Sequence, residues 1–212
     1  MLAIAMPLHA ASTPETAQLK TLLDRLQKHY QQTNSFSAKF KEAIMPAGGT
    51  RRDRAGTVYY SKPGRMRWEF EGQDQEIIVS DGKQLYSYQP DLNQVIETPL
   101  EQAFRSSSFA AFLLGIGNVQ RDFDASVPAK PPADGLKHVA LKPKSAGDII
   151  EMGLDPSTLD LRTLRLTDAL GDVTELTFAD IKNGAALDDK LFAFIPPAGA
   201  DIVRAPQQPN SH

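Results

Sequence analysis

Residues 56–95 constrain the fold most, because they alternate apolar and polar side chains in short runs separated by turn residues. Within this stretch Met66, Trp68 and Phe70 alternate with arginine and glutamate, the period-two pattern of a strand buried on one face. The apolar positions carry aromatic rings and no ionisable group arranged for catalysis. We therefore expect an antiparallel meander with one face suited to binding apolar groups.

A tight hairpin is predicted at residues 80–83 (SDGK). Its Asp-Gly pair favours a turn in which both central residues have positive φ. A two-residue turn centred on this pair places Val79 opposite Gln84 and Ile77 opposite Tyr86, on one side of the hairpin.

An amphipathic helix is predicted over residues 14–32. Thr13 can cap its first turn, and Pro14 suits the first helical position. Apolar residues recur at helical spacing along one side, namely Leu19, Leu22, Leu23, Leu26 and Tyr30. This stripe needs an apolar partner surface, which the strands provide. Leu22 and Leu26 belong either to the core, which we favour, or to a cavity wall.

About ten strands are predicted, and their short connections favour antiparallel neighbours. They span residues 35–41, 56–61, 65–71, 77–80, 84–88, 94–97, 137–141, 149–154, 159–167 and 173–182. A helical stretch within residues 99–117 carries an apolar stripe that includes Phe109, Phe112 and Leu113. A sheet this wide curls, and helices laid over its concave side leave a cavity unless side chains fill it.

The expected fold class is mainly β with α: an open (unclosed) antiparallel β-barrel of about ten strands with helices covering the concave face. We expect one domain over residues 12–205 and a disordered tail over residues 206–212.

Composition argues against several functional classes. The net charge of −3 and the lack of a long basic run argue against a nucleic-acid partner. Without cysteine, the chain has no disulfide, thiolate metal site or lipid-attachment cysteine. The four histidines are scattered, and we find no paired carboxylates, Ser-His-Asp arrangement or glycine-rich phosphate loop. We expect no catalytic residue, no metal and no cofactor.

A local cluster of basic residues has two interpretations. It comprises Arg51, Arg52, Arg54, Lys62, Arg65 and Arg67, interrupted by Asp53. It is either the solvated face of a hairpin or a surface that attracts an anionic headgroup or an acidic partner.

The first residues, MLAIAMPLHAAS, resemble the end of a secretory signal peptide, with a short apolar stretch followed by small residues. Residues 1–11 are therefore expected to be the remainder of such a peptide, although a frayed hydrophobic tail is the alternative. About ten apolar residues are too few to span a bilayer. We expect export.

Five segments, in order, resemble motifs of the LolA family of periplasmic lipoprotein carriers. They are residues 35–40 (SFSAKF), 60–68 (YSKPGRMRW), 77–88 (IIVSDGKQLYSY), 141–144 (LKPK) and 192–202 (FAFIPPAGADI). The resemblance implies an unclosed barrel with a helical lid over a hydrophobic cavity. It also implies a monomeric periplasmic carrier that takes triacylated lipoproteins from an inner-membrane ABC transporter to an outer-membrane receptor.

The resemblance and the strand pattern together give a set of candidate site residues. The lipid-binding candidates are Met66, Trp68, Phe70, Val79, Tyr86, Tyr88, Phe109, Phe112 and Leu113. Each could instead serve only the core, because cavity walls and cores are chemically alike. Lys62 occupies the position at which the family's arginine is thought to hold the lid through its backbone, so it is the candidate lid latch; the alternative is a plain turn lysine. Lysine keeps the charge but lacks the planar fork of donors.

Two other functional classes remain open. One is a carrier or sensor of another lipid, such as a glycolipid or isoprenoid, on the same scaffold. The other is a regulatory or scaffold domain that uses the curved sheet for protein contacts alone.

Overall fold

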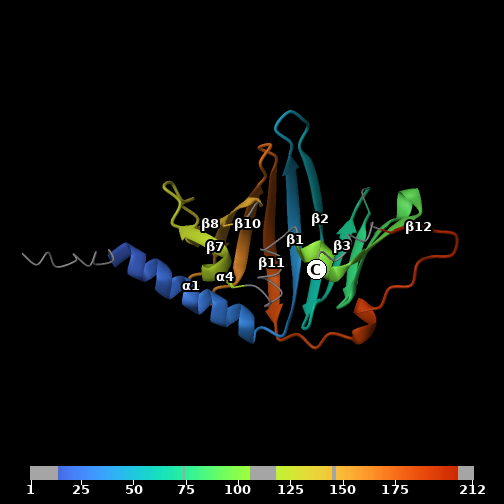
Figure 1. Ribbon diagram of the computed structural model, residues 1–212, viewed down its shortest axis with the longest axis horizontal. Helices are drawn as coiled ribbons and strands as arrows, with labels where there is room; N and C mark the ends of the chain where they lie inside the picture. The colour runs from blue at the N-terminus through green and yellow to red at the C-terminus, as the bar shows by residue number, and fades with distance from the viewer. Residues whose placement is uncertain (1–13, 74, 106–117, 145–146, 205–212) are drawn as a thin grey trace, which may run out of the picture.

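The computed structural model describes residues 14–73, 75–105, 118–144 and 147–204. Twelve strands form one sheet in the order β12-β6-β5-β4-β3-β2-β1-β11-β10-β9-β8-β7. Their bounds are β1 Ser35–Met45, β2 Arg52–Ser61, β3 Arg65–Glu71, β4 Ile77–Asp81, β5 Gln84–Gln89, β6 Gln94–Pro99, β7 Phe123–Ser126, β8 Lys137–Pro143, β9 Ile149–Leu154, β10 Leu161–Thr167, β11 Val173–Asn183 and β12 Asp201–Arg204. The sheet is strongly curved, with β7 and β12 at its two edges (Figure 1).

The prediction of an open antiparallel sheet is confirmed, because β7 and β12 do not pair with each other. The described residues form twelve strands instead of about ten. The two strands that sequence reasoning missed, β7 and β12, have four residues each, too few for an alternating pattern to be recognised. In addition, β12 pairs parallel to β6, whereas all other neighbouring strands pair antiparallel.

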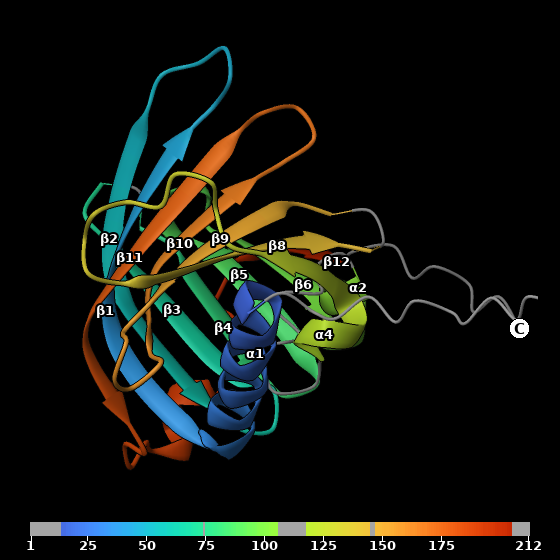
Figure 2. The same cartoon turned by 90° about the vertical axis from the view of Figure 1, so that its left-hand side faces the viewer.

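Helix α1 (Pro14–Gln32) has the predicted bounds and lies across the open side of the curved sheet (Figure 2). Its Leu26 is fully buried and Leu22 packs partly buried against the same core. The short helices are α2 (Leu100–Arg105), α4 (Val119–Asp122), η1 (Pro90–Leu92) and η2 (Asp189–Phe192). The core joins α1 to the concave face of the sheet through residues that include Leu23, Tyr30, Phe40, Val58, Leu141, Met152, Leu154 and Phe178.

Gly56 allows two phenyl rings to meet across strand β2. In the register, Gly56 lies between Phe40 of β1 and Phe70 of β3, whose ring centroids are 5.1 Å apart. A Cβ atom at this position would lie 1.9 Å from the Glu69 carbonyl oxygen and 2.9 Å from Cζ of Phe40. A side chain is therefore excluded here by the backbone of β3 itself.

The predicted register of the β4–β5 hairpin is wrong by two residues. Val79 lies opposite Tyr86, and Ile77 lies opposite Tyr88. Gly82 has φ +96°, but Asp81 does not enter the positive-φ region, so the turn is centred on Gly82-Lys83, with glycine at its first central position. The Asp81 carboxylate instead accepts hydrogen bonds from the backbone N–H groups of Lys83 and Gln84, at 2.7 and 2.8 Å.

Candidate functional site

Met66, Trp68 and Phe70 lie on the concave face of β3. Their cross-strand partners in β2 are Tyr60, Val58 and Gly56, in that order. The Trp68 ring centroid lies 4.8 Å from that of Phe40, and the Phe70 side chain is buried beside them. Met66 and Trp68 are half-buried, so this apolar surface is only partly covered.

A small apolar cavity lies between the end of α1 and this surface. Its volume is about 50 Å³, and its lining includes Tyr30, Phe36, Trp68, Phe178 and Ile181. The cavity has room for a few water molecules and adjoins Trp68, one of the predicted lipid-binding residues.

The prediction that Val79, Tyr86 and Tyr88 share this face is wrong. Trp68 pairs with Ile78, so the neighbouring Val79 and its partner Tyr86 point to the convex side, as does Tyr88. The misplacement arises because residues 77–79 are all apolar, so their alternation does not reveal which of them joins the face of Trp68.

The C-terminal segment covers these three residues on the convex face. The Phe194 ring centroid lies 5.3 Å from that of Tyr86 and 6.0 Å from that of Tyr88. Arg67 donates a hydrogen bond from Nη1 to the Leu191 carbonyl oxygen, 3.2 Å away, and Val79 is fully buried. Val79, Tyr86 and Tyr88 therefore belong to a second, small core outside the curve of the sheet.

The other predicted lipid-binding residues, Phe109, Phe112 and Leu113, lie outside the described residues.

Lys62 joins strand β2 to the last turn of α1. Its Nζ donates hydrogen bonds to the carbonyl oxygens of Tyr30 and Gln31, at 2.8 and 2.7 Å. The last carbonyls of a helix have no partner within the helix, and a cation at this end also complements the helix dipole. Burial lowers the pKa of Lys62. The lysine thus bonds backbone carbonyl groups of α1.

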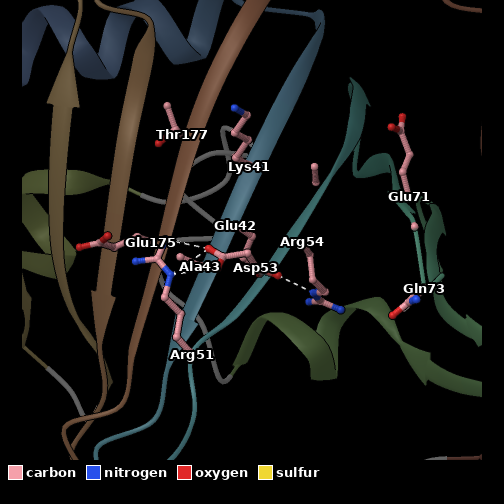
Figure 3. A pocket seen from close by; sticks show the side chains of 12 residues that line it. Lys41, Glu42, Ala43, Arg51, Asp53, Arg54, Glu71, Gln73, Glu175 and Thr177 are labelled. Carbon is pink, nitrogen blue, oxygen red and sulfur yellow. Dashed lines mark hydrogen bonds and ion pairs between the residues drawn. The ribbon is translucent and has the colours of Figure 1, made fainter.

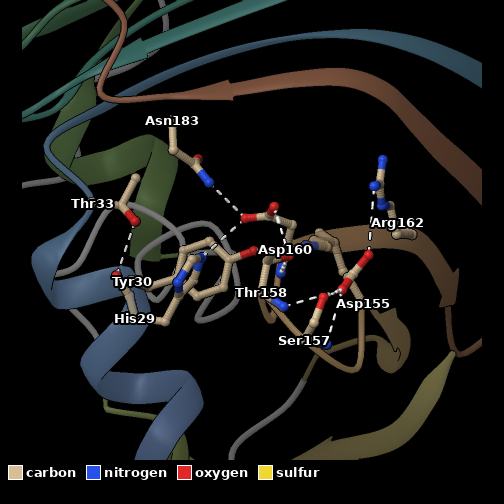
Figure 4. A network of polar contacts seen from close by, with 10 residues as sticks. His29, Tyr30, Thr33, Asp155, Ser157, Thr158, Asp160, Arg162 and Asn183 are labelled. Carbon is tan, nitrogen blue, oxygen red and sulfur yellow. Dashed lines mark hydrogen bonds and ion pairs between the residues drawn. The ribbon is translucent and has the colours of Figure 1, made fainter.

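A second set of bonds involves the same turn of α1 (Figure 4). The Asp160 carboxylate lies 3.3 Å from Nε2 of His29 and accepts a 2.7 Å hydrogen bond from the Asn183 side chain. The backbone N–H of Leu161 donates to the Tyr30 hydroxyl at 3.2 Å. Burial raises the pKa of Tyr30, so the phenol stays protonated. Sequence reasoning missed this network, because Asp160 is far from α1 along the chain and has no recognisable motif.

Most of the basic cluster is paired with acidic groups. An open hollow over β1, β2 and β11 has a volume of about 600 Å³, and Arg51 binds Asp53 in it. Figure 3 shows the side chains that line it. The other ion pairs of the cluster are Arg54 with Glu42 and Glu76, Arg65 with Asp189, and Arg67 with Glu69. This pairing favours the interpretation of the cluster as a solvated and partly buried structural face.

Within the described ranges, no group of three or more His, Asp or Glu residues is placed to hold a metal ion. Among the same residues, no helix combines the length and apolar character needed to cross a membrane.

An unclosed antiparallel sheet, with a helix over an apolar concave face, defines the class of open half-barrel proteins. A solved structure of an uncharacterised conserved protein from Thermus thermophilus has the same fold, with a TM-score of 0.55 at 15% identity, covering 89% of this chain and 99% of that one. The family model for "Outer membrane lipoprotein carrier protein LolA" matches residues 31–195.

Relatives named outer-membrane lipoprotein carrier protein are similar over most of their length. The protein from Dechloromonas aromatica is 32% identical over 183 residues, covering 85% of this chain and 86% of the relative. The protein from Bordetella pertussis is 31% identical over 208 residues, covering 95% of each. The chain belongs to the LolA family of outer-membrane lipoprotein carrier proteins.

Proposed function

We propose that this protein carries lipoproteins through the periplasm and shelters their acyl chains on the concave face of the sheet. The observation that carries this proposal is the half-buried apolar surface of Met66 and Trp68 beside helix α1, whose last turn contacts Lys62 and Asp160. Family membership supplies the class of cargo.

The energetics of acyl chains require such shelter. Removing one CH₂ group from water is favourable by about 0.8 kcal/mol, so a chain of about fifteen carbons gains on the order of 10 kcal/mol in an oily site. Free diffusion of a lipoprotein through water is therefore negligible. The Met and Ile side chains and the ring face of Trp68 offer an acyl chain no directional bond. The affinity for cargo is therefore set by how far the cover over the concave face opens.

The small cavity beneath α1, with a volume of about 50 Å³, is far smaller than an acyl chain, so the segments that cover the concave face must move during loading. Lys62 and Asp160 both contact the last turn of α1, and we assign them the role of holding this end of the helix closed. Release of these bonds then accompanies uptake of cargo.

The same proposal includes the partners and the location. The carrier receives triacylated lipoproteins from an inner-membrane ABC transporter and passes them, as a monomer, to an outer-membrane receptor. Residues 12–205 form the carrier domain, and residues 1–11 belong to the export signal.

The test is removal of a labelled lipoprotein from membranes while the transporter hydrolyses ATP. Ile78 and Ile77 are neighbours on β4, both half-buried, and point to opposite faces of the sheet. We expect Ile78→Asp to reduce lipoprotein removal at least tenfold and Ile77→Asp to retain most of it, provided both variants keep the wild-type circular dichroism spectrum. Equal activity of folded Ile78→Asp and wild type would contradict the proposal. Mass spectrometry of extracted lipids distinguishes a lipoprotein carrier from a carrier of another lipid.

A further inference from the structure

The concave face carries one continuous cross-strand row from the core to the open edge of the sheet. Residues paired in register share a face, so the pairings from β2 to β12 trace a single line. In order they are Val58, Trp68, Ile78, Ser87, Ile96 and Val203. We call these six residues the apolar row.

Burial decreases steadily along the apolar row. Val58 is 2% exposed, Trp68 and Ile78 are half-buried, and Ile96 and Val203 are 37% and 42% exposed. One end of the row is therefore dry and packed, and the other end opens to solvent at the β6–β12 edge.

Ser87 interrupts the apolar row without offering a free polar group. Its hydroxyl donates a 2.7 Å hydrogen bond to the Glu76 carboxylate, whose other oxygen accepts a hydrogen bond from Arg54. The Arg54 guanidinium in turn lies 3.9 Å from the Phe70 ring centroid. Because this network satisfies the hydroxyl, an apolar chain can pass over Ser87 at little cost.

The length of one acyl chain suits the apolar row. Neighbouring strands lie about 4.8 Å apart, so the three spacings from β3 to β6 cover about 14 Å. The hydrocarbon core of a bilayer is about 30 Å thick, so one acyl chain spans about 15 Å. A chain laid across the strands from Trp68 thus reaches Ile96, which pairs with Val203 at the β6–β12 edge.

We propose that one acyl chain of the cargo lies along the apolar row, with its methyl end at Trp68 and its carbonyl end at the β6–β12 edge. The carbonyl end of the acyl chain stays at the exposed edge of the apolar row, because the packed end of the row at Trp68 offers its oxygen no hydrogen-bond partner. The polypeptide of the cargo then leaves the carrier over β12. This inference rests on the proposed function, because it assumes that the concave face takes acyl chains.

Two features of the chain make the orientation measurable. Trp68 is the single tryptophan of the sequence and lies at the inner end of the apolar row. Val203 and Ile202 are neighbours on β12 with exposures of 42% and 40%, and they point to opposite faces. Ile202 is therefore a matched control for Val203.

The experiment measures quenching of Trp68 fluorescence by a long-chain fatty acid with a nitroxide near either its methyl end or its carboxyl end. We expect strong quenching by the methyl-end probe and weak quenching by the carboxyl-end probe. We also expect Val203→Asp to raise the Kd about tenfold, equivalent to about 1.4 kcal/mol, and Ile202→Asp to change it less than twofold. Val203→Ala is a milder variant, expected to weaken binding about threefold.

The outcomes separate the inference from the proposed function. Equal or reversed quenching by the two probes, or equal effects of the two aspartate variants, would overturn the inference and leave acyl binding intact. Absence of quenching by both probes would overturn both, because no chain would then reach the concave face.

Discussion

The ammonium group of Lys62 lies 2.8 Å from the carbonyl oxygen of Tyr30, and this bond ties strand β2 to the end of α1. The Asp160 network contacts the same helical turn. Because a cover that opens must be held by bonds that can break, these attachments are the natural points of control.

The first prediction concerns Lys62. Lys62→Met keeps the aliphatic stem but removes both hydrogen bonds to α1, which costs about 1 kcal/mol in the free energy of unfolding. Hydrogen exchange of the Thr33 amide, which donates to His29 within the same turn, should become faster. Lys62→Arg supplies donors again and should restore slow exchange. Unchanged exchange in Lys62→Met would show that the lysine does not hold the helix.

The second prediction concerns Asp160. Its carboxylate accepts hydrogen bonds from Asn183 and Thr158 and faces His29, so Asp160→Asn removes the negative charge and one acceptor oxygen from this network. We expect a loss of about 2 kcal/mol in the free energy of unfolding by urea denaturation. Asp124→Asn is the control, because Asp124 is an exposed residue whose ion pair with Lys144 is 3.9 Å long. Equal stability of the two variants would count against the network.

Acid should loosen the loop that presents Asp160. Hydrogen bonds from the Ser157 hydroxyl and from the backbone of Thr158 and Ser157 lower the pKa of Asp155. The positive charge of Arg162 lowers it further. The folded pKa is depressed, so the stabilisation is complete above the ordinary carboxylate pKa of about 4 and is lost as pH falls through the folded value. Thermal unfolding from about pH 7 down to about pH 2 should therefore show a shallower decline in Asp155→Asn than in wild type. Parallel declines would exclude this residue as a source of the acid sensitivity.

Gly56 gives a test of the concave packing. Gly56→Ala places a methyl group 1.9 Å from the Glu69 carbonyl oxygen, so β2 and β3 must separate, at a cost of about 3 kcal/mol or more. Gly48→Ala is the matched control, since nothing lies within 4 Å of a Cβ at that position. Urea denaturation of both variants measures the difference. A Gly56→Ala protein as stable as the control would mean that the two strands are not so close.

The convex core should contribute to stability and not to cargo binding. Phe192 belongs to this core, because its ring centroid lies 5.2 Å from the guanidinium of Arg65 on the convex face of β3. It is 2% exposed, so Phe192→Ala is expected to cost about 3–5 kcal/mol. Ile195, three residues further on and 87% exposed, should tolerate alanine within about 0.5 kcal/mol. Folded Phe192→Ala should bind a fatty-acid probe with wild-type affinity at low temperature. Specific loss of binding would return Val79, Tyr86 and Tyr88 to the set of cargo-binding residues.

Local sequence patterns predicted the helices and strands well, but they predicted less well which residues share a face of the sheet. The stripe of Leu19 to Tyr30 predicted α1 with its bounds, and alternation in β3 predicted that Trp68 and Phe70 share a face. Alternation within a strand does not tell which face meets the next strand, so three apolar residues in a row at Ile77, Ile78 and Val79 left β4 ambiguous.

Contacts between distant segments were not predictable from such patterns. The Asp160 network, the covering of Tyr86 by Phe194 and the parallel pairing of β12 with β6 each join residues that are far apart in the chain. The resemblance to the LolA family pointed to Lys62 as a latch, but only the geometry revealed that it bonds the carbonyls of α1.

The most direct test of the central claim is solution NMR of the loaded carrier. Intermolecular nuclear Overhauser effects should connect the acyl-chain methylenes of the cargo to the Trp68 indole on the concave face, and none should reach the Tyr86 ring on the convex face. Contacts to Tyr86 without contacts to Trp68 would contradict the account, because the acyl chains would then bind outside the curve of the sheet.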